Sequence, residues 1–278
     1  MQLDNLIELI EKLLPPETAM EGDPIGLQVQ SGRTEVHNIM TALEVTDEVI
    51  DEAVENKIDC IIAFHPLIFM PLKSIHDDDR VGRAVSKLIK NDISLITVHT
   101  AFDAFEEGTS RILAEKLNLD IIDFLIPDDK YPNKGIGLIT ETKKAISKED
   151  ILKNVHSVCN SPLRYNIGKT NNIKRIAILG GSGSSYINDA IDAEADVFIT
   201  ADVTYHKFHY INGKMMIIDP GHYEMEQFVP FGLKTLLEEN LNNGSFNKII
   251  VTSKLTNPVR YYPGTKDYKT LQNKLLNN

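Results

Sequence analysis

The chain repeats one order of secondary-structure signals in its two halves, and this repeat constrains the fold more than any single motif. The apolar run IDCIIA at 58–63 carries an acid at its second position, and so does ADVFIT at 195–200. The next apolar run in each half leads to a histidine that an acid follows four residues later. These pairs are His99 with Asp103 and His222 with Glu226. The pattern predicts a duplicated α/β unit.

Short β-branched runs alternate with amphipathic helical patterns in both halves. Strands are expected at 38–45, 58–63 and 93–98, and again at 174–181, 195–200, 214–220 and 248–253. Helices are expected between them: one after Thr46, one over 79–90, one opened by Ser147 and a long one from about Tyr223. The alternation predicts mostly parallel or mixed sheets covered by helices, an α/β fold. Residues 127–135, PDDKYPNKG, are the best candidate for a linker.

Composition excludes several classes of protein. Lys and Arg total 29 against 40 Asp and Glu, a formal net charge of -11, which opposes broad binding to a nucleic-acid backbone. Two cysteines are too few for a disulfide framework. No apolar stretch reaches the roughly 20 residues that span a bilayer. The N-terminal segment has neither a basic region nor a cleavage site, so a cytoplasmic protein without membrane contact is expected.

Polar side chains follow the predicted strands at corresponding places. They are His65, the pair His99 and Asp103, and the pair His222 and Glu226. Ligand sites in α/β sheets form beyond the carboxyl ends of strands, and imidazole with carboxylate suits Zn²⁺, Mn²⁺, Fe²⁺, Co²⁺ or Ni²⁺. Taken singly, His65 before Pro66 fits a turn and His222 fits a helix cap. Taken together, the set favours a site for divalent metal cations, one or two per chain.

Two further groups of residues have two interpretations each. The turn formed by Gly180, Gly181, Ser182 and Gly183 follows a strand and could hold a phosphate with its amides. It lacks the third glycine of the dinucleotide fingerprint and the lysine of the phosphate loop, so a tight strand-to-helix turn is favoured. Asp202 and His206 end another strand and fit substrate contact or support of the metal, and Asp202 equally fits a helix cap.

Five ordered motifs resemble the family of GTP cyclohydrolase 1 type 2 homologues, also called NIF3-like proteins. The motifs are FHPLIF at 64–69, HTAFD at 99–103, GGSG at 180–183, TADVTYH at 200–206 and GHYEME at 221–226. They cover nearly the whole chain. The chain resembles the short form, because the segment 130–172 is too small for the extra domain of longer members.

The resemblance implies two intertwined domains, each a variant of one repeat. We expect domain 1 to hold 1–126 plus 241–278 and domain 2 to hold 127–240, with a metal cleft between them. It also implies a ring-shaped homohexamer. The sequence itself shows no helix with an unambiguous self-association stripe, so this expectation comes from the resemblance alone.

Carried over by position, the resemblance implies His65, Asp103, His222 and Glu226 as metal ligands, with Glu226 bridging two ions. His99 falls on a family histidine beside the site. One departure matters: the family usually has two consecutive histidines before the proline, and here the first is Phe64. The early tryptophan motif is also changed, reading GDPIGL at 22–27. A single-metal or asymmetric site is therefore an alternative.

The resemblance favours a metal-dependent hydrolase that acts on a small molecule such as a nucleotide. The activity in the family name opens the imidazole ring of GTP and releases formate. His99, Asp202 or His206 would then move protons, and the glycine turn would hold phosphates. The alternative is a non-catalytic, metal-binding hexameric scaffold that regulates a partner. A DNA-binding ring is the weakest hypothesis, because the charge opposes it.

Overall fold

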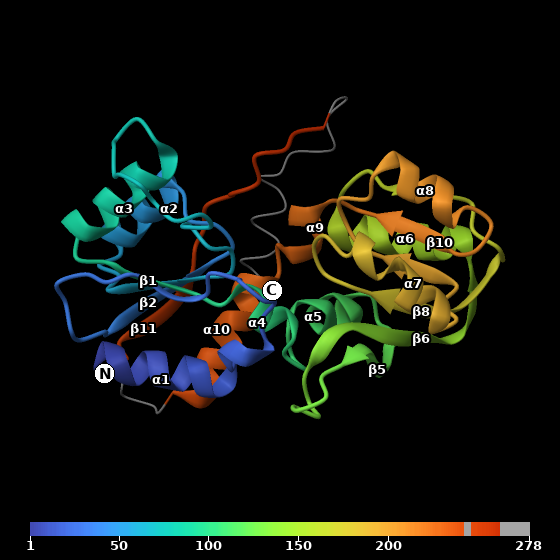
Figure 1. The fold of residues 1–278 in the computed structure, drawn as a ribbon, viewed down its shortest axis with the longest axis horizontal. Helices are drawn as coiled ribbons and strands as arrows, with labels where there is room; N and C mark the ends of the chain where they lie inside the picture. The colour runs from blue at the N-terminus through green and yellow to red at the C-terminus, as the bar shows by residue number, and fades with distance from the viewer. Residues whose placement is uncertain (242–245, 262–278) are drawn as a thin grey trace. The chain divides into compact units, whose positions relative to one another are not determined.

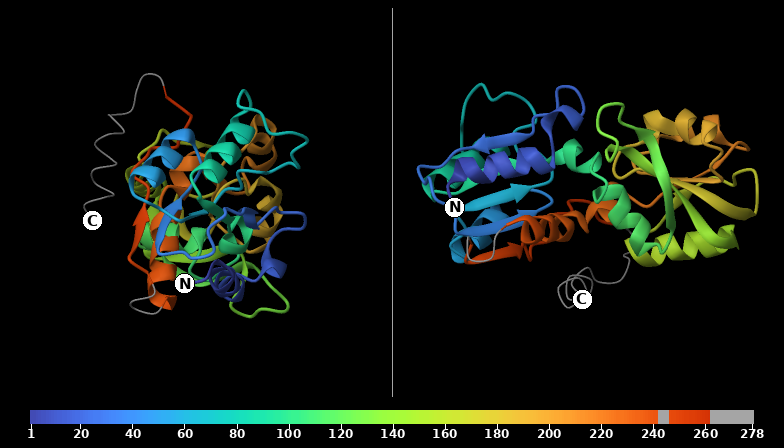
Figure 2. Two further views of the ribbon diagram at one scale, coloured as in Figure 1. Left: turned by 90° about the vertical axis from the view of Figure 1, so that its left-hand side faces the viewer. Right: turned by 90° about the horizontal axis from the view of Figure 1, so that it is seen from below.

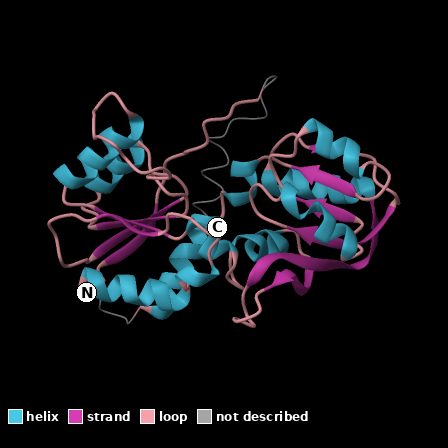
Figure 3. Ribbon diagram, viewed as in Figure 1, coloured by secondary structure: helices cyan, strands magenta, loops and turns pink. Residues whose placement is uncertain are grey.

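The computed structural model describes residues 1–241 and 246–261, which form two compact units. Of the described residues, the first unit holds 1–102 and 229–258, and the second holds 103–228 and 259–261. Each unit consists of a sheet with helices on both faces, as the colouring of Figure 3 shows. Among the described residues, no helix has both the length and the apolar character that a membrane span requires.

The sheet of the first unit has the strand order β1-β4-β3-β2-β11 (Figure 1). All neighbours are parallel except β1, which runs antiparallel to β4 at one edge. Its strands are β1 (Gly26–Val29), β2 (Asn38–Ala42), β3 (Cys60–Ala63), β4 (Ser94–Thr97) and β11 (Lys248–Val251). Its helices are α1 (Leu3–Leu13), α2 (Asp47–Glu55), α3 (Arg80–Lys90), α10 (Val229–Asn240) and the short η1 (Pro16–Thr18). The helix α4 (His99–Asp103) follows β4 and crosses into the second unit.

Successive side chains along the parallel strands point to opposite faces of this sheet, so each face has its own set of buried residues. Met40, Ile61 and Leu95 are fully buried and join one apolar cluster with residues of α2 and α3. The neighbouring side chains point to the other face, where the Thr41 hydroxyl donates to the Pro230 carbonyl of α10 at 2.7 Å. This helix, orange in Figure 2, packs along β2 and β11. The unit is therefore a three-layer structure.

The sheet of the second unit has the order β5-β6-β8-β9-β10-β7, with β8, β9 and β10 parallel and the remaining pairs antiparallel. Its strands are β5 (Asp120–Pro127), β6 (Gly135–Ser147), β7 (Arg164–Tyr165), β8 (Asn172–Ile178), β9 (Val197–Ile199) and β10 (Met216–Asp219). Its helices are α5 (Thr109–Lys116), α6 (Lys148–Cys159), α7 (Ile187–Asp192), α8 (Tyr205–Ile211), α9 (His222–Glu226) and the short η2 (Ser184–Tyr186).

The two sheets confirm the predicted duplication and α/β fold class. The order β1-β4-β3-β2 in one unit matches β7-β10-β9-β8 in the other, with the antiparallel strand next to the third parallel strand in both. The acid at the second position of each repeated run, Asp59 or Asp196, forms the same kind of hydrogen bonds in both units. The Asp59 carboxylate accepts hydrogen bonds from the amides of His37 and Asn38 at the start of β2, and the Asp196 carboxylate accepts them from the amides of Lys174 and Arg175 within β8.

The boundaries of the units differ from those expected at 126/127 and 240/241. They fall at 102/103 and 228/229, because α5 packs on β5 and β6, whereas α10 packs on β2 and β11. Residues 127–135 are not a linker between domains; they turn the chain between β5 and β6, which pair in one sheet. Of the expected domain 1, residues 242–245 and 262–278 lie outside the described part of the chain.

Predicted helix starts are confirmed where a side chain caps them. The Thr46 hydroxyl accepts the Val49 amide at 3.3 Å, and Ser147 forms a capping box with Asp150. The long helix expected from about Tyr223 is instead two helices, α9 and α10. Proline lacks an amide hydrogen and suits the first turn of a helix, so Pro230 marks a new start rather than a helix interior.

Candidate metal centre

In the second unit, three side chains meet beyond the carboxyl ends of the parallel strands. They are Ser182 after β8, Asp202 after β9 and His222 after β10. The His222 Nδ1 lies 2.7 Å from an Asp202 carboxylate oxygen, and the Ser182 hydroxyl donates to that same oxygen. Asp202 therefore holds the histidine ring by one nitrogen and leaves the other nitrogen turned away from it.

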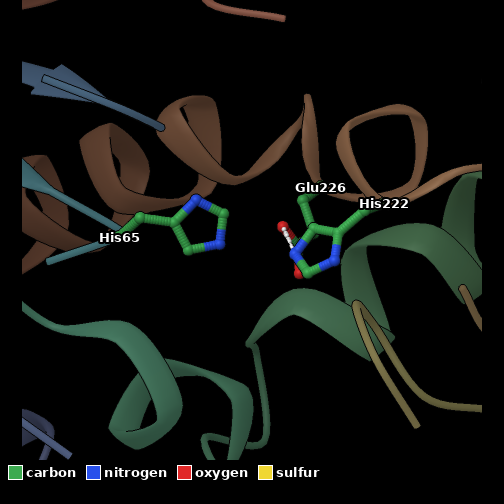
Figure 4. A group of neighbouring side chains, drawn as sticks. All are labelled: His65, His222 and Glu226. Atoms are coloured by element: carbon green, nitrogen blue, oxygen red, sulfur yellow. Dashed lines mark ion pairs between the residues drawn. The ribbon is translucent and has the colours of Figure 1, made fainter. Parts of the chain in front are cut away.

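The other nitrogen of His222 faces a buried acid on the same helix. The Nε2 atom lies 3.0 Å from Oε2 of Glu226, an ion pair that Figure 4 draws as a dashed line. Only 3% of the Glu226 side chain is exposed, against 36% of His222. The spacing of four residues on α9 places both groups on one face. Figure 4 also draws His65, which belongs to the first unit. The α9 pair offers one nitrogen and one carboxylate, the donor types of a transition-metal site.

The charge state of Asp202 follows from its neighbours. Burial raises the pKa of this carboxyl, but the hydrogen bonds from Ser182 and His222 and the charge of His222 lower it further, so the pKa lies below its ordinary value. An ionised carboxylate only accepts hydrogen bonds. His222 therefore carries a proton on Nδ1, and Nε2 is the atom that a metal ion would bind.

The glycine turn at 180–183 leaves space for the Glu226 carboxylate. A side chain at Gly181, whose φ is +65°, would place its Cβ 2.5 Å from Oε1 of Glu226. The amides of Gly180 and Gly183 donate to a serine and a threonine hydroxyl within the same unit, at 3.2 and 2.8 Å. Two of the amides considered for a phosphate are thus already engaged. The turn gives the Glu226 carboxylate its space next to His222.

In the first unit, His65 follows β3 and is held in the same way. Its Nδ1 lies 2.8 Å from a carboxylate oxygen of Glu44, which follows the neighbouring strand β2. The imidazole is largely buried, so its position is defined by packing as well as by this bond. Its other ring nitrogen is Nε2, the atom that a metal ion would bind.

His99, the first residue of α4, is held by an acid from the turn before β1. Its Nδ1 lies 2.7 Å from Oδ1 of Asp23, whose side chain is 4% exposed. The amide and hydroxyl of Thr100 also donate to this carboxylate. Burial raises the pKa of Asp23, but the hydrogen bonds from His99 and Thr100 and the charge of His99 outweigh it and place the pKa below its ordinary value.

Phe64 fills the position where the family usually has a histidine. Its side chain is fully buried, and its ring centroid lies 4.8 Å from that of His65 and 5.5 Å from that of His99. The ring of Phe102 packs against it from another side at 6.3 Å. The first unit thus has a buried aromatic side chain, an apolar wall, where the family usually has a histidine.

Asp103, His206 and the two cysteines are the remaining residues that the sequence analysis considered. Asp103 ends α4, and its Oδ1 is shielded from solvent. His206 is exposed on α8 with its ring against Tyr205, and no hydrogen bond among the described residues joins it to His222. Burial raises the pKa of the thiols of Cys60 and Cys159, as expected for cysteines that are not nucleophiles.

Two partners of the histidines were absent from the sequence candidates. Glu44 lies beyond the end of β2, but the expected strand 38–45 placed it inside, which hid it from the strand-end rule. Asp23 lies in a turn that is 76 positions from His99, and no local pattern connects them. A predicted strand that ended at Ala42 would have identified Glu44 as a strand-end residue. Asp23 can be identified only from the tertiary structure.

The chain is similar to a known family over most of its length. The sequence profile of the family described as Duf34/NIF3 (NGG1p interacting factor 3) matches residues 1–258. The GTP cyclohydrolase 1 type 2 homolog of Clostridium perfringens is 33% identical over 94% of this chain and 100% of its own.

Two solved structures are also similar. The hypothetical protein SA1388 of Staphylococcus aureus is 30% identical with a TM-score of 0.86, over 94% of this chain and 99% of its own. Reduced HcgD of Methanocaldococcus jannaschii is 28% identical with a TM-score of 0.74, over 90% of this chain and 97% of its own.

Proposed function

The chain belongs to the Duf34/NIF3 family, and on that premise we propose that it binds a divalent metal ion and hydrolyses a small molecule with it. The proposed ligands are His65, Asp103, His222 and Glu226. The observation that carries the proposal is the pair on α9. A buried carboxylate faces the Nε2 of His222, while Asp202 holds the Nδ1 of the same ring.

These residues fit a metal ion better than they fit a structural role. Burial of a carboxylate costs free energy unless a cation or hydrogen-bond donors compensate it. Glu226 is almost entirely buried beside His222, and a bound metal ion would add to that compensation. A carboxylate on the second nitrogen of a ligand histidine is the usual outer support of a metal site. His65 and Asp103 join the proposed set through the family resemblance, and Glu44 gives His65 the same support.

A bound divalent ion supplies a Lewis acid and lowers the pKa of water toward neutrality. The chain supplies the remaining functions. His222 and Glu226 offer donor atoms, and Gly181 keeps the space around the Glu226 carboxylate open. Asp202 holds a proton at His222 Nδ1, and Ser182 completes its hydrogen bonds. The substrate class, a nucleotide or related heterocycle, rests on the name of the relatives alone.

Phe64 favours one strongly held ion over a symmetric pair. Its buried ring has no donor atom, and it packs against the two histidines of the first unit. The same observation supports a second candidate function, a non-catalytic metal-binding scaffold assembled as a homohexamer, because two-metal hydrolysis uses both ions.

The first experiment is metal content by plasma mass spectrometry on protein purified without chelator or affinity-tag histidines. We expect about one equivalent of a transition metal in the wild type, because the four proposed ligands are enough for one ion. His222→Ala and Glu226→Gln should each lose the metal. His206→Ala is the matched control, since that histidine is exposed on α8, and it should keep the wild-type content. A wild-type protein that binds no metal after reloading would contradict the proposal.

A second measurement separates the two candidate functions. The metal-loaded protein is incubated with a panel of nucleotides and phosphoesters, with release of formate and phosphate as the readouts. Turnover that disappears in Glu226→Gln and persists in His206→Ala supports the hydrolase. Full metal content without turnover on any member of the panel supports the scaffold.

A further inference from the structure

Three histidines at strand ends share one arrangement. Each has its Nδ1 within hydrogen-bond distance of a carboxylate from another segment of the same unit. The pairs are His65 with Glu44, His99 with Asp23 and His222 with Asp202, at 2.8, 2.7 and 2.7 Å. In each case the carboxylate selects Nδ1 as the ring nitrogen that carries the proton, and Nε2 is then the atom whose lone pair would bind a metal ion. Two of the three histidines are in the proposed ligand set.

The internal repeat extends this comparison to the third histidine. His99 begins α4 and Asp103 ends it, as His222 begins α9 and Glu226 ends it. Both helices are five residues long and directly follow the third parallel strand of their sheet. We propose that His99 is a metal ligand through Nε2, the counterpart of His222, and that Asp23 is the residue that positions it. This rests on the proposed metal-binding function.

The backbone at His99 supports a role beyond packing. His99 has a φ of +24°, in the left-handed region that side chains other than glycine seldom adopt. In the other unit, Asp202 has a φ of +55°. Each histidine–carboxylate pair next to a five-residue helix thus includes one residue with a left-handed backbone. At His99 this conformation persists because the surrounding structure holds the side chain in position, and strain of this kind concentrates at functional sites.

The surroundings of His99 match this assignment. Asp23 is nearly inaccessible to solvent and accepts three hydrogen bonds, one from the ring and two from Thr100. The ring itself is 21% exposed and lies 5.4 Å from the ring of His65, centroid to centroid. Phe64 packs against both rings and removes the family's first histidine from the donor set. His99 is a further imidazole beside Phe64 in the same unit.

The test measures binding of Co²⁺ alone, by competition with a coloured chelator and by the visible spectrum of the bound ion. The variants are His99→Asn, chosen because asparagine tolerates a left-handed backbone, and Asp23→Asn, which keeps the shape of the carboxylate. We expect His99→Asn to weaken binding by about 100-fold and Asp23→Asn by about 10-fold, the range seen when a ligand's support is removed. His37→Asn is the control, since that histidine is exposed and its ring lies against Glu35 at the surface.

A second readout follows the ring directly. Long-range ¹H–¹⁵N spectra of the metal-free protein should show the His99 ring protonated at Nδ1 in the wild type, and a mixture of tautomers in Asp23→Asn. Circular dichroism establishes that each variant is folded. If His99→Asn does not fold, a weaker Co²⁺ affinity in folded Asp23→Asn, with its altered tautomer, carries the result.

The outcomes separate the two proposals. If the wild type binds Co²⁺ and His222→Ala loses it, but His99→Asn and Asp23→Asn keep the wild-type affinity and spectrum, His99 is not a ligand while the proposed function stands. If the wild type binds no Co²⁺, both proposals fail. A weakened affinity with a changed Co²⁺ spectrum in His99→Asn, and no change in His37→Asn, establishes the assignment.

Discussion

The two units present the same short helix, a histidine followed four residues later by an acid, but they hold its histidine differently. In the first unit, Asp23 precedes the repeated strands and is 4% exposed. In the second unit, Asp202 follows β9, a strand of the repeat, and is 56% exposed. The donor pair is therefore what the two units share, while the carboxylate that orients it comes from a different element in each.

This difference separates two requirements of a metal site. A ligand must be a nitrogen or oxygen donor at the right place, and the proposed ligands in both units are a histidine and an acid at the same spacing. An orienting group needs only to accept a hydrogen bond from Nδ1, which any suitably placed carboxylate can do. Because the orienting group is buried in one unit and exposed in the other, its loss should affect stability more in the first unit.

The largest expected effect tests the apolar wall of the first unit. Phe64→Ala removes a fully buried ring and leaves a cavity between two histidines and Phe102, so we expect the free energy of unfolding to fall by about 3–5 kcal/mol. The measurement is denaturant unfolding. Phe69→Ala is the control, since its ring is 61% exposed and its loss should cost less than about 0.5 kcal/mol. Equal effects of the two variants would contradict the burial of Phe64.

The next largest effect is expected from filling the space around the Glu226 carboxylate in the second unit. Gly181→Ala introduces both an unfavourable left-handed backbone and a contact of 2.5 Å with the Glu226 carboxylate. Gly213→Ala is the matched control, because Gly213 has a φ of +78° and open space around it. We expect the control to lose about 1–2 kcal/mol of stability from the backbone alone. Gly181→Ala should lose more and should also bind metal more weakly.

Metal titration and denaturant unfolding of the two glycine variants check this prediction. If Gly181→Ala loses no more stability than Gly213→Ala and binds metal like the wild type, the Glu226 carboxylate does not need the space that Gly181 leaves.

The smallest expected effect concerns pH and the buried acid of the first unit. The folded-state pKa of Asp23 lies below its ordinary value of 3.8, so its ionised form stabilises the folded state. That contribution is complete above pH 3.8 and is lost as the pH falls through the folded-state pKa. In chelator-treated protein, Asp23→Asn should therefore be less stable than the wild type at neutral pH, with the difference shrinking on acidification.

Unfolding curves recorded between neutral and acid pH measure this difference. Asp78→Asn is the control, since that acid is exposed in the loop before α3, and its stability should follow the wild type throughout. A difference between wild type and Asp23→Asn that stays constant with pH would show that the Asp23 carboxylate does not act through its charge.

Much of the fold and the two histidine–acid pairs could be predicted from the sequence, because both depend on local order. Short β-branched runs and amphipathic helical patterns predicted the strands and helices, and the caps at Thr46 and Ser147 predicted where α2 and α6 begin. The repeated spacing in HTAFD and HYEME identified the two pairs of histidine and acid. The turn at 127–135 was misinterpreted because a polar loop inside a sheet and a polar linker have the same composition.

The sequence by itself determined the duplicated α/β pattern and the residue types available for a metal, since each is set by neighbours along the chain. Only the tertiary structure decided which acid holds which histidine, that Phe64 is a buried wall, and that Gly181 makes room for Glu226. Asp23 and His99 are 76 positions apart. Contacts of this kind depend on how the sheet brings distant turns to one edge, and no local pattern encodes them.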